Sequence, residues 1–398
     1  MDQQFIQIVN GKLITPSGIV DSGSITIRDG VIIDIGRTGN AAPGATIIDA
    51  EGNYVSPGFV DIHVHGGGGY DFMDGHELAF LKIAETHARF GTTAMLPTTL
   101  TSGREELLHS LHIYEEANRK NKTGAQFIGM HLEGPYFAMN QRGAQDPLYI
   151  RDPDPDEYRE VLAASSSIRR WSAAPELPGA LAFGDYLCSK GVLPAIAHTE
   201  AIFEDAEKAF HHGYSLITHL YSAMLGVTRK NAFRYAGVIE SAYLIDEMDV
   251  EIIADGVHLP APLLKLVHKI KGAGRTALIT DAMRAAGTNV TESVLGNISS
   301  GLNVIVEDGV AKLPDRSSFA GSVATADRLV RNMMQLAGVS LMESIQMMSA
   351  TPARIMGLQE RKGTLRVGMD ADIILFDEDI DVKKTFVNGA LVFDAADQ

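Results

Sequence analysis

Imidazole and carboxylate side chains recur at one kind of position in this sequence, directly after short apolar runs that predict buried strands. In chain order they are His63 and His65, Glu133, His198, His219, Asp255 with His258, and Asp281. A buried apolar strand has no packing reason to end repeatedly in these residue types. Nitrogen and oxygen ligands of this kind suit Zn²⁺, Fe²⁺ or a similar divalent ion.

The spacing of these residues predicts how they would share the metal. His63 and His65 are alternate residues of a strand, so both imidazoles point to one face. We expect Glu133, His198 and His219 to hold the principal ion, and His63 and His65 to hold a second one with Glu133 as the bridge. The residues leave open whether one or two ions bind.

Each member of this set also has a plain structural interpretation. His198, His219 or His258 alone would be a hydrogen-bonded structural residue, and Asp281 alone could cap a helix. Their common position at the ends of successive strands favours a shared site instead.

The residue types indicate hydrolysis of an amide. A divalent ion lowers the pKa of bound water from about 15.7 to about 7 and can polarise a carbonyl group. A carboxylate beside that water can accept its proton and pass it to the leaving amine. Asp281 is the residue we expect in this role.

The elements that must position these groups alternate between apolar strands and amphipathic helices. The sequence predicts helices over 77–90, 104–120 and 202–211, and strands ending at 59–63, 93–97, 127–133, 168–173, 193–198, 216–219, 250–254 and 277–280. Eight such strands favour an α/β fold of the (β/α)8 TIM-like barrel type, whose active sites lie at the carboxyl ends of the strands. A doubly wound nucleotide-binding sheet is disfavoured, because the glycines at 66–69 follow a His-rich strand end and open no helix.

The two ends of the chain have a different pattern of short strands and tight turns. Asp29-Gly30 and Asn388-Gly389 are favoured two-residue hairpin turns between apolar runs. We expect residues 1–55 and 360–398 to build one small β-sandwich domain, and residues 56–359 to form the metal-dependent barrel catalytic domain.

Composition and charge limit the partners and the cellular compartment to be expected for this protein. The 398-residue chain carries a net charge of −16, which disfavours nucleic acid and anionic membranes as partners. It has a single cysteine, Cys188, no signal-like N-terminus and no apolar run long enough to span a bilayer. These features predict a cytoplasmic protein.

At the strand-end residues the chain resembles the amidohydrolase superfamily and, within it, the N-acetylglucosamine-6-phosphate deacetylase family. The matching segments cover nearly the whole chain in order: Pro-Gly-Phe-Val-Asp-Ile-His-Val-His-Gly at 57–66, Gly-Met-His-Leu-Glu-Gly-Pro-Tyr at 129–136, Ala-His-Thr at 197–199, Thr-His-Leu-Tyr at 218–221, Ile-Ala-Asp-Gly-Val-His at 253–258, Thr-Asp-Ala-Met at 280–283, Ala-Gly-Ser at 320–322 and Gly-Met-Asp-Ala-Asp at 368–372.

The resemblance implies roles for several residues. Glu133, His198 and His219 would hold the catalytic metal, Asp281 would be the general base and then the acid, and His258 would contact the sugar. It also implies a homodimer in which an Arg or His of the neighbouring subunit reaches the substrate phosphate. Members that keep the His-x-His pair, as this chain does, bind two ions.

The departures from the family pattern affect residues that are expected to recognise the substrate. Gln145 stands where the family usually has His, Ser222 replaces an Asn near the phosphate, and Glu200 adds a carboxylate near His198. The usual Arg-Glu-Pro-Gly stretch becomes Arg-Lys-Asn-Ala-Phe-Arg at 229–234, which is either a phosphate-binding cluster or a solvated loop. The expected substrate-binding residues are His258, Gln145, Ser222, Ala223, Arg229 and Arg234.

These observations predict deacetylation of an N-acetylhexosamine 6-phosphate, with N-acetylglucosamine 6-phosphate as the first candidate. Shifted substrates, either N-acetylgalactosamine 6-phosphate or another N-acyl or cyclic amide, are the alternatives within the superfamily. Cyclic-amide hydrolases commonly bridge two metals with a carboxylated Lys, and Glu133 stands at that point here. A non-catalytic sugar-phosphate-binding protein is a further alternative, although Asp281 and all the expected ligands are present.

Overall fold

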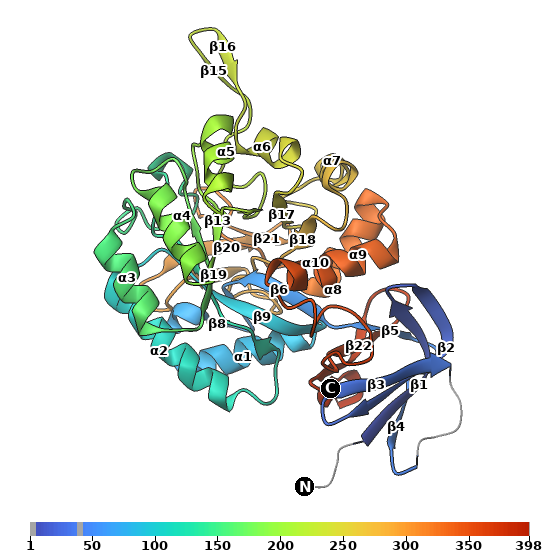
Figure 1. Cartoon of the computed structure of the whole chain (residues 1–398). Coiled ribbons are helices and arrows are strands. Elements are labelled where there is room, and N and C mark those ends of the chain that lie inside the picture. The colour runs from blue at the N-terminus through green and yellow to red at the C-terminus, as the bar shows by residue number, and fades with distance from the viewer. Residues whose placement is uncertain (1–4, 38–42, 398) are drawn as a thin grey trace.

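The computed structural model describes residues 5–37 and 43–397, and a parallel barrel forms its centre (Figure 1). Each barrel strand pairs in parallel with the next one along the chain. The strands are β6 (Phe59–Val64), β9 (Thr92–Thr99), β10 (Gln126–Phe127) with β11 (Met130–Glu133), β12 (Ile168–Ala173), β13 (Leu193–Ile196), β14 (Leu216–Ile217), β17 (Asp249–Ile252) and β18 (Thr276–Leu278). All eight predicted strand positions are confirmed.

Hydrogen bonds beyond the last strand bring the two ends of the barrel sheet together. The backbone N–H of Asp281 donates to the carbonyl oxygen of His63 at 2.9 Å, and that of His65 donates to Ala282 at 2.9 Å. The first and last strands are therefore linked at their carboxyl ends. This link places the His-x-His pair beside Asp281.

Helices surround the barrel on its outer side (Figure 1). In the helix over 104–120, Leu107, Leu111 and Tyr114 are buried at helical spacing. Asp154 caps the helix over 155–164, which has Pro155 in its first turn. The helices are α1 (Glu77–Ala88), α2 (Arg104–Lys120), α3 (Pro155–Ala164), α4 (Ala180–Ser189), α5 (Phe203–His211), α6 (Val238–Leu244), α7 (Ala261–Lys271), α8 (Ala326–Asn332), α9 (Leu341–Met348) and α10 (Ala350–Ile355).

Both ends of the chain join one further sheet, as predicted. Its order is β24 (Ala390–Asp394), β23 (Val382–Val387), β22 (Ile373–Phe376), β5 (Tyr54–Pro57), β1 (Phe5–Thr15), β2 (Gly18–Arg28) and β3 (Val31–Arg37), with β4 (Thr46–Asp49) also paired to β1. Asp29-Gly30 and Asn388-Gly389 have positive φ angles of 51°, 80°, 47° and 76°, which is the geometry of the mirror-image hairpin turn.

This terminal sheet encloses a core of its own. Ile8, Leu13, Ile25 and Phe386 are buried in it, separately from the main barrel core. The fold is therefore a (β/α)8 barrel with an additional β domain, as the sequence predicts. Strand β5 crosses the expected boundary at residue 55, and the division into 1–55 with 360–398 and 56–359 stays a prediction.

Several short elements were not predicted. The antiparallel hairpin of β15 (Thr228–Lys230) and β16 (Phe233–Tyr235) projects beyond α5 and α6 (Figure 1). A three-stranded sheet of β19 (Glu292–Leu295), β20 (Leu302–Glu307) and β21 (Val310–Lys312) follows the last barrel strand, and β7 (Gly66–Gly67) pairs with β8 (Tyr70–Asp71). Across residues 5–37 and 43–397, no helix combines the length and apolar character that a bilayer crossing requires.

Candidate active site

A cavity of about 540 Å³ opens at the carboxyl ends of the barrel strands. Most of the predicted site residues line it: His65, Glu133, Gln145, His198, His219, Ser222, Ala223, His258 and Asp281. His63 is fully buried beside them, with its Nε2 atom 3.2 Å from Nε2 of His65. Arg229 and Arg234 lie elsewhere, exposed on the β15–β16 hairpin.

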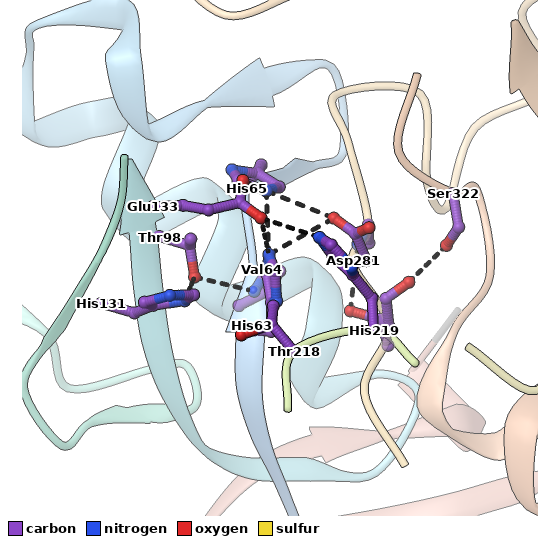
Figure 2. A network of polar contacts seen from close by, with 12 residues as sticks. His63, Val64, His65, Thr98, His131, Glu133, Thr218, His219, Asp281 and Ser322 are labelled. Atoms are coloured by element: carbon purple, nitrogen blue, oxygen red, sulfur yellow. Dashed lines mark hydrogen bonds and ion pairs between the residues drawn. The ribbon is translucent and has the colours of Figure 1, made fainter. Parts of the chain in front are cut away.

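Two clusters of possible metal ligands meet at Glu133. Figure 2 shows Glu133 with His63, His65 and His219. One consists of His63, His65 and Glu133, and the other of Glu133, His198 and His219; within each, the ligand atoms lie within 4.8 Å of one another. Oε1 of Glu133 is 3.1 Å from Nε2 of His219 and 3.4 Å from that of His198, while Oε2 is 3.4 Å from Nε2 of His65. Glu133 is therefore a member of both candidate ligand sets.

The donor atoms of both clusters fit a divalent metal ion. Nε2 of His198 and Nε2 of His219 face each other at 3.2 Å, as do those of His63 and His65. Nδ1 of His198 lies 2.8 Å from the carbonyl oxygen of Gln141, which accepts its proton and leaves Nε2 with a free lone pair. Buried nitrogen and carboxylate ligands converging on one point are the ligand set that such an ion requires.

The electrostatics of this site also favour a bound positive charge. Burial alone would lower the pKa of His63 and His65, but the neighbouring carboxylates of Glu133 and Asp281 raise these pKa values to about 9 and about 10. Burial alone would raise the pKa of Glu133, but His63 and the other imidazoles hold it well below its usual range. Two closely spaced buried carboxylates of this kind need compensating cations.

Asp281 lies at the edge of the His63–His65–Glu133 cluster (Figure 2). Its Oδ1 atom is 3.2 Å from Nε2 of His65 and 3.6 Å from Nε2 of His63. Burial would raise its pKa, but the two imidazoles lower that pKa below its ordinary value, so the carboxylate is ionised. An ionised carboxylate that lines the cavity is suited to accept a proton there.

The backbone is strained at four of the predicted site residues. His198, His219, Ala223 and Asp281 have φ angles of 47°, 30°, 52° and 46°, in the left-handed region that side chains other than glycine rarely adopt. Such strain costs about 1–3 kcal/mol per residue and clusters at functional sites. Its coincidence with the strand-end residues supports a functional role for this part of the barrel.

Gln145 has a more specific position than the sequence suggests. Its Nε2 donates to Oε2 of Glu133 at 2.7 Å, and its Oε1 accepts the backbone N–H of Thr101 at 2.8 Å. The residue therefore contacts the shared carboxylate as well as lining the cavity.

His258 is held by the carboxylate that precedes it. Its Nδ1 lies 2.7 Å from Oδ2 of Asp255, and its ring packs 4.6 Å from the ring of Phe319. Burial would raise the pKa of Asp255, but His258 lowers it. A proton on Nδ1 facing an ionised carboxylate leaves Nε2 of His258 as the atom available to a ligand.

Sequence reasoning missed some of the cavity wall. Among the described residues that line the cavity, Arg142 alone carries a permanent positive charge. Tyr221 and Phe319 also line it, and their types alone gave no signal. Glu200, expected near the mouth, is exposed, accepts hydrogen bonds from Asn140 at 3.2 Å and does not line the cavity.

Comparisons with known proteins agree with this geometry. The amidohydrolase family model matches residues 54–392. The chain is 32% identical over 392 residues to an N-acetylglucosamine-6-phosphate deacetylase from Lysinibacillus sphaericus, covering 96% of this chain and 97% of the relative. It is 31% identical over 381 residues to an N-acetylgalactosamine-6-phosphate deacetylase from Escherichia coli O157:H7, with the same coverage.

Solved structures of deacetylases are similar to this structure over nearly the whole chain. A mutant N-acetyl-D-glucosamine-6-phosphate deacetylase from Mycobacterium smegmatis, in complex with N-acetyl-D-glucosamine-6-phosphate, superposes with a TM-score of 0.89 at 29% identity, covering 98% of this chain and 99% of that one. The N-acetylglucosamine-6-phosphate deacetylase from Pasteurella multocida gives 0.90 at 27% identity, covering 97% and 99%. The chain therefore belongs to the amidohydrolase family and, within it, to the N-acetylglucosamine-6-phosphate deacetylase family.

Proposed function

We propose that this protein hydrolyses the N-acetyl group of an N-acetylhexosamine 6-phosphate, with N-acetylglucosamine 6-phosphate as the first candidate. The products are acetate and the amino-sugar phosphate. The observation that carries the proposal is the ionised carboxylate of Asp281, 3.2 Å from His65, at the edge of two His/Glu clusters that share Glu133. The names of the similar enzymes supply the substrate class.

Two divalent ions, Zn²⁺ or Fe²⁺, complete the proposed site. Glu133, His198 and His219 would hold the principal ion, and His63, His65 and Glu133 the second. Bound metal would lower the pKa of water and polarise the acetyl carbonyl group. Buried imidazole and carboxylate ligands suit both metals.

The residues around the clusters supply proton transfer and positioning. Asp281 accepts the proton of the attacking water and then gives it to the nitrogen of the leaving amine. His258, with its Nδ1 held by Asp255, presents Nε2 to a hydroxyl group of the sugar. Ser222 and Ala223, which follow the ligand His219 on the cavity wall, contact the sugar phosphate.

N-Acetylgalactosamine 6-phosphate is the second candidate substrate. The relative with that activity in its name is as similar to this chain as those named for the glucosamine isomer, at 31% against 32% identity. The two sugars differ only in the configuration of one hydroxyl group, so the same metal and proton-transfer groups would serve both.

We also propose a homodimer joined through the β15–β16 hairpin. The hairpin projects from the barrel (Figure 1). Val227, directly before β15, and Phe233 of β16 are 60% and 71% exposed. An isolated two-stranded hairpin is marginally stable in water, so it gains from packing on another surface. A second copy of the chain is the occupant that the family resemblance favours.

The charges on this hairpin favour an anion as their partner. Arg229 and Arg234 are directly paired across the two strands. Like charges in this position destabilise a hairpin unless a group between them compensates. The 6-phosphate of a substrate bound in the partner's cavity would compensate the charges of these two arginines. The Arg142 side chain that lines that same cavity would contact this phosphate as well.

The free cysteine Cys188 is compatible with a reducing compartment, so we place the enzyme in the cytoplasm.

An acetate-release screen tests the function. Metal-loaded protein is incubated with N-acetylglucosamine, N-acetylgalactosamine and N-acetylmannosamine, each with and without a 6-phosphate, and metal content is measured on the same sample. We expect release from a 6-phosphorylated sugar, first from the glucosamine isomer. Absence of release from every phosphorylated sugar by metal-loaded protein would contradict the proposal.

A further inference from the structure

A buried ion pair lies inside the barrel beneath the metal-ligand clusters. Arg170 of β12 and Glu251 of β17 both have fully buried side chains. The guanidinium group of Arg170 donates to both carboxylate oxygens of Glu251, through NH1 to Oε1 and through NH2 to Oε2 at 2.8 Å. Arg170 also donates to Oγ1 of Thr218 at 2.8 Å and to the carbonyl oxygen of Ile62 at 3.2 Å.

This pair lies directly behind one predicted metal ligand. Oε2 of Glu251 is 3.6 Å from Nδ1 of His63, the ring nitrogen that faces away from the clusters. Nε2 of the same ring is 3.2 Å from Nε2 of His65 and 3.4 Å from Oε1 of Glu133. This separation is longer than a hydrogen bond, so Glu251 acts on Nδ1 through its charge. A carboxylate at this distance favours the tautomer with its proton on Nδ1, which leaves the Nε2 lone pair for a metal.

Stability alone does not explain an ion pair at this position. Removing two charges from water is costly, and replacement of buried ion pairs by apolar residues is often neutral or stabilising. Part of the barrel interior is apolar, with Val60, Ile62, Leu96, Ile253 and Ile279 fully or almost fully buried in one cluster. The side chains beside the pair are polar, since Arg170 donates to Thr218, whose hydroxyl oxygen lies 3.1 Å from that of Ser172. These hydroxyl groups need hydrogen-bond partners but not charged ones, so packing alone does not require an ion pair at positions 170 and 251.

We propose that Glu251, held in place by Arg170, is a positioning residue that fixes His63 with Nε2 directed at the His63–His65–Glu133 cluster. The pair would then be required for tight binding of an ion at this cluster, and not for the ion at Glu133, His198 and His219. This inference rests on the metal binding in the proposed function.

The test compares two paired variants of the full-length protein. Arg170→Met/Glu251→Gln and Arg170→Met/Glu251→Leu both remove the two charges and have similar volumes. They differ in whether a polar oxygen atom remains opposite Nδ1 of His63. Each protein is stripped with a chelator, titrated with Co²⁺, and followed by bound-metal analysis and visible absorption.

We expect wild-type protein to bind two Co²⁺ ions. The Arg170→Met/Glu251→Leu variant should bind the second ion about 10–100-fold more weakly, the usual effect of losing a partner of a metal-bound imidazole. The Arg170→Met/Glu251→Gln variant should recover most of this affinity. His65→Asn, which removes a ligand of this cluster alone, gives the reference spectrum of protein loaded only at the other cluster.

A matched control removes another buried ion pair. Lys362 and Asp372 have side chains 3% and 4% exposed and lie at the terminal sheet. Lys362→Met/Asp372→Leu should bind both ions as wild type does. Binding of the first ion by each variant also reports that its barrel is folded.

The inference is overturned if wild type binds a single ion, or if Arg170→Met/Glu251→Leu binds two with wild-type affinity and spectrum. Equal loss of the second ion in the Lys362→Met/Asp372→Leu control would overturn it as well. Acetate release is not part of this readout. A protein that binds two ions in the expected manner but releases no acetate would contradict the proposed function alone.

Discussion

The side-chain amide of Gln145 donates a hydrogen bond of 2.7 Å to Oε2 of Glu133, the carboxylate shared by both ligand clusters. The backbone N–H of Thr101 donates to Oε1 of the same amide at 2.8 Å, which fixes its nitrogen toward Glu133. Gln145 thus holds the shared ligand in one orientation. A residue predicted to bind substrate from the sequence therefore has a contact with the metal-ligand set.

Replacing Gln145 should weaken metal binding. In Gln145→Leu the hydrogen bond to Glu133 is lost, and we expect metal affinity to fall about 10–100-fold, as for other partners of metal ligands. Competition with a chelator measures the affinity, and Gln359→Leu, an exposed residue outside the cavity, is the control. Unchanged affinity in Gln145→Leu would mean that Glu133 keeps its orientation without this bond.

The β15–β16 hairpin, which the sequence did not predict, should control the oligomeric state. Val227→Ser/Phe233→Ser should weaken dimerisation by at least about 2 kcal/mol, because a buried aromatic residue at the centre of an interface contributes that much. Sedimentation velocity over a range of concentrations measures the shift to monomer. Leu148→Ser, at a residue 77% exposed elsewhere, is the control and should remain dimeric. A dimer of unchanged stability in the double variant would exclude the hairpin as the interface.

The paired arginines of the hairpin should act on the phosphate of the partner's substrate. Charge-assisted hydrogen bonds contribute about 1.5–3 kcal/mol each. Arg229→Met/Arg234→Met should therefore raise KM for N-acetylglucosamine 6-phosphate at least about tenfold and leave turnover of the unphosphorylated sugar unchanged. Steady-state kinetics on both sugars measure the difference, and an equal effect on both would contradict a phosphate contact.

Mixing experiments decide from which subunit these arginines act. Arg229→Met/Arg234→Met is mixed with Asp281→Asn, so that mixed dimers combine an intact hairpin from one chain with an intact cavity from the other. Low-KM turnover of N-acetylglucosamine 6-phosphate, which neither variant has alone, should reappear on mixing if the hairpin reaches the partner. If each hairpin serves its own chain, mixing would restore nothing.

The stability of the site region should depend on pH through Asp71. Burial raises the pKa of Asp71 to about 6, against smaller opposing effects of Met73, His65 and Arg284. Because the folded-state pKa lies above the unfolded value, the contribution to stability is fully present below about pH 4 and is lost as the pH rises through about 6. Its side chain accepts from the backbone of Met73 and Gly296, so it ties the loop after β8 to the end of β19.

Asp71→Asn should remove this dependence, since the amide is uncharged at every pH. Between about pH 5 and about pH 8, metal-free wild type should lose about 1 kcal/mol more of its unfolding free energy than Asp71→Asn. Urea unfolding at the two pH values measures both losses. Equal losses in the two proteins would show that Asp71 is ionised in the folded state throughout this range.

The strand-end residues could be predicted because a parallel barrel brings the carboxyl ends of its strands to one mouth. His65, Glu133, His198, His219 and Asp281 each end a strand or follow its end by at most three residues, so their place in sequence fixes their place in space. The terminal sheet was predictable for a similar reason, since its hairpin turns have sequences that require positive φ angles.

Other parts of the site depend on contacts that sequence spacing does not define. Gln145 reaches Glu133 from the loop between β11 and α3, and Arg170 meets Glu251 across the barrel, although they are 81 positions apart in sequence. The hairpin carrying Arg229 and Arg234 lacks an alternating apolar pattern, so the sequence left a solvated loop open as an interpretation. In each case the contact is defined by the folded structure and not by the spacing of the residues in the sequence.

The most direct test of the central claim is acetate release from N-acetylglucosamine 6-phosphate by metal-loaded wild type and by Asp281→Asn. General acid–base catalysis contributes about 10²–10⁴-fold, so turnover should fall by at least this factor in the variant. Metal content should stay unchanged, because the ligand clusters themselves remain intact. Equal turnover by the two proteins, or no release by metal-loaded wild type, would contradict metal-dependent deacetylation with Asp281 as its proton-transfer residue.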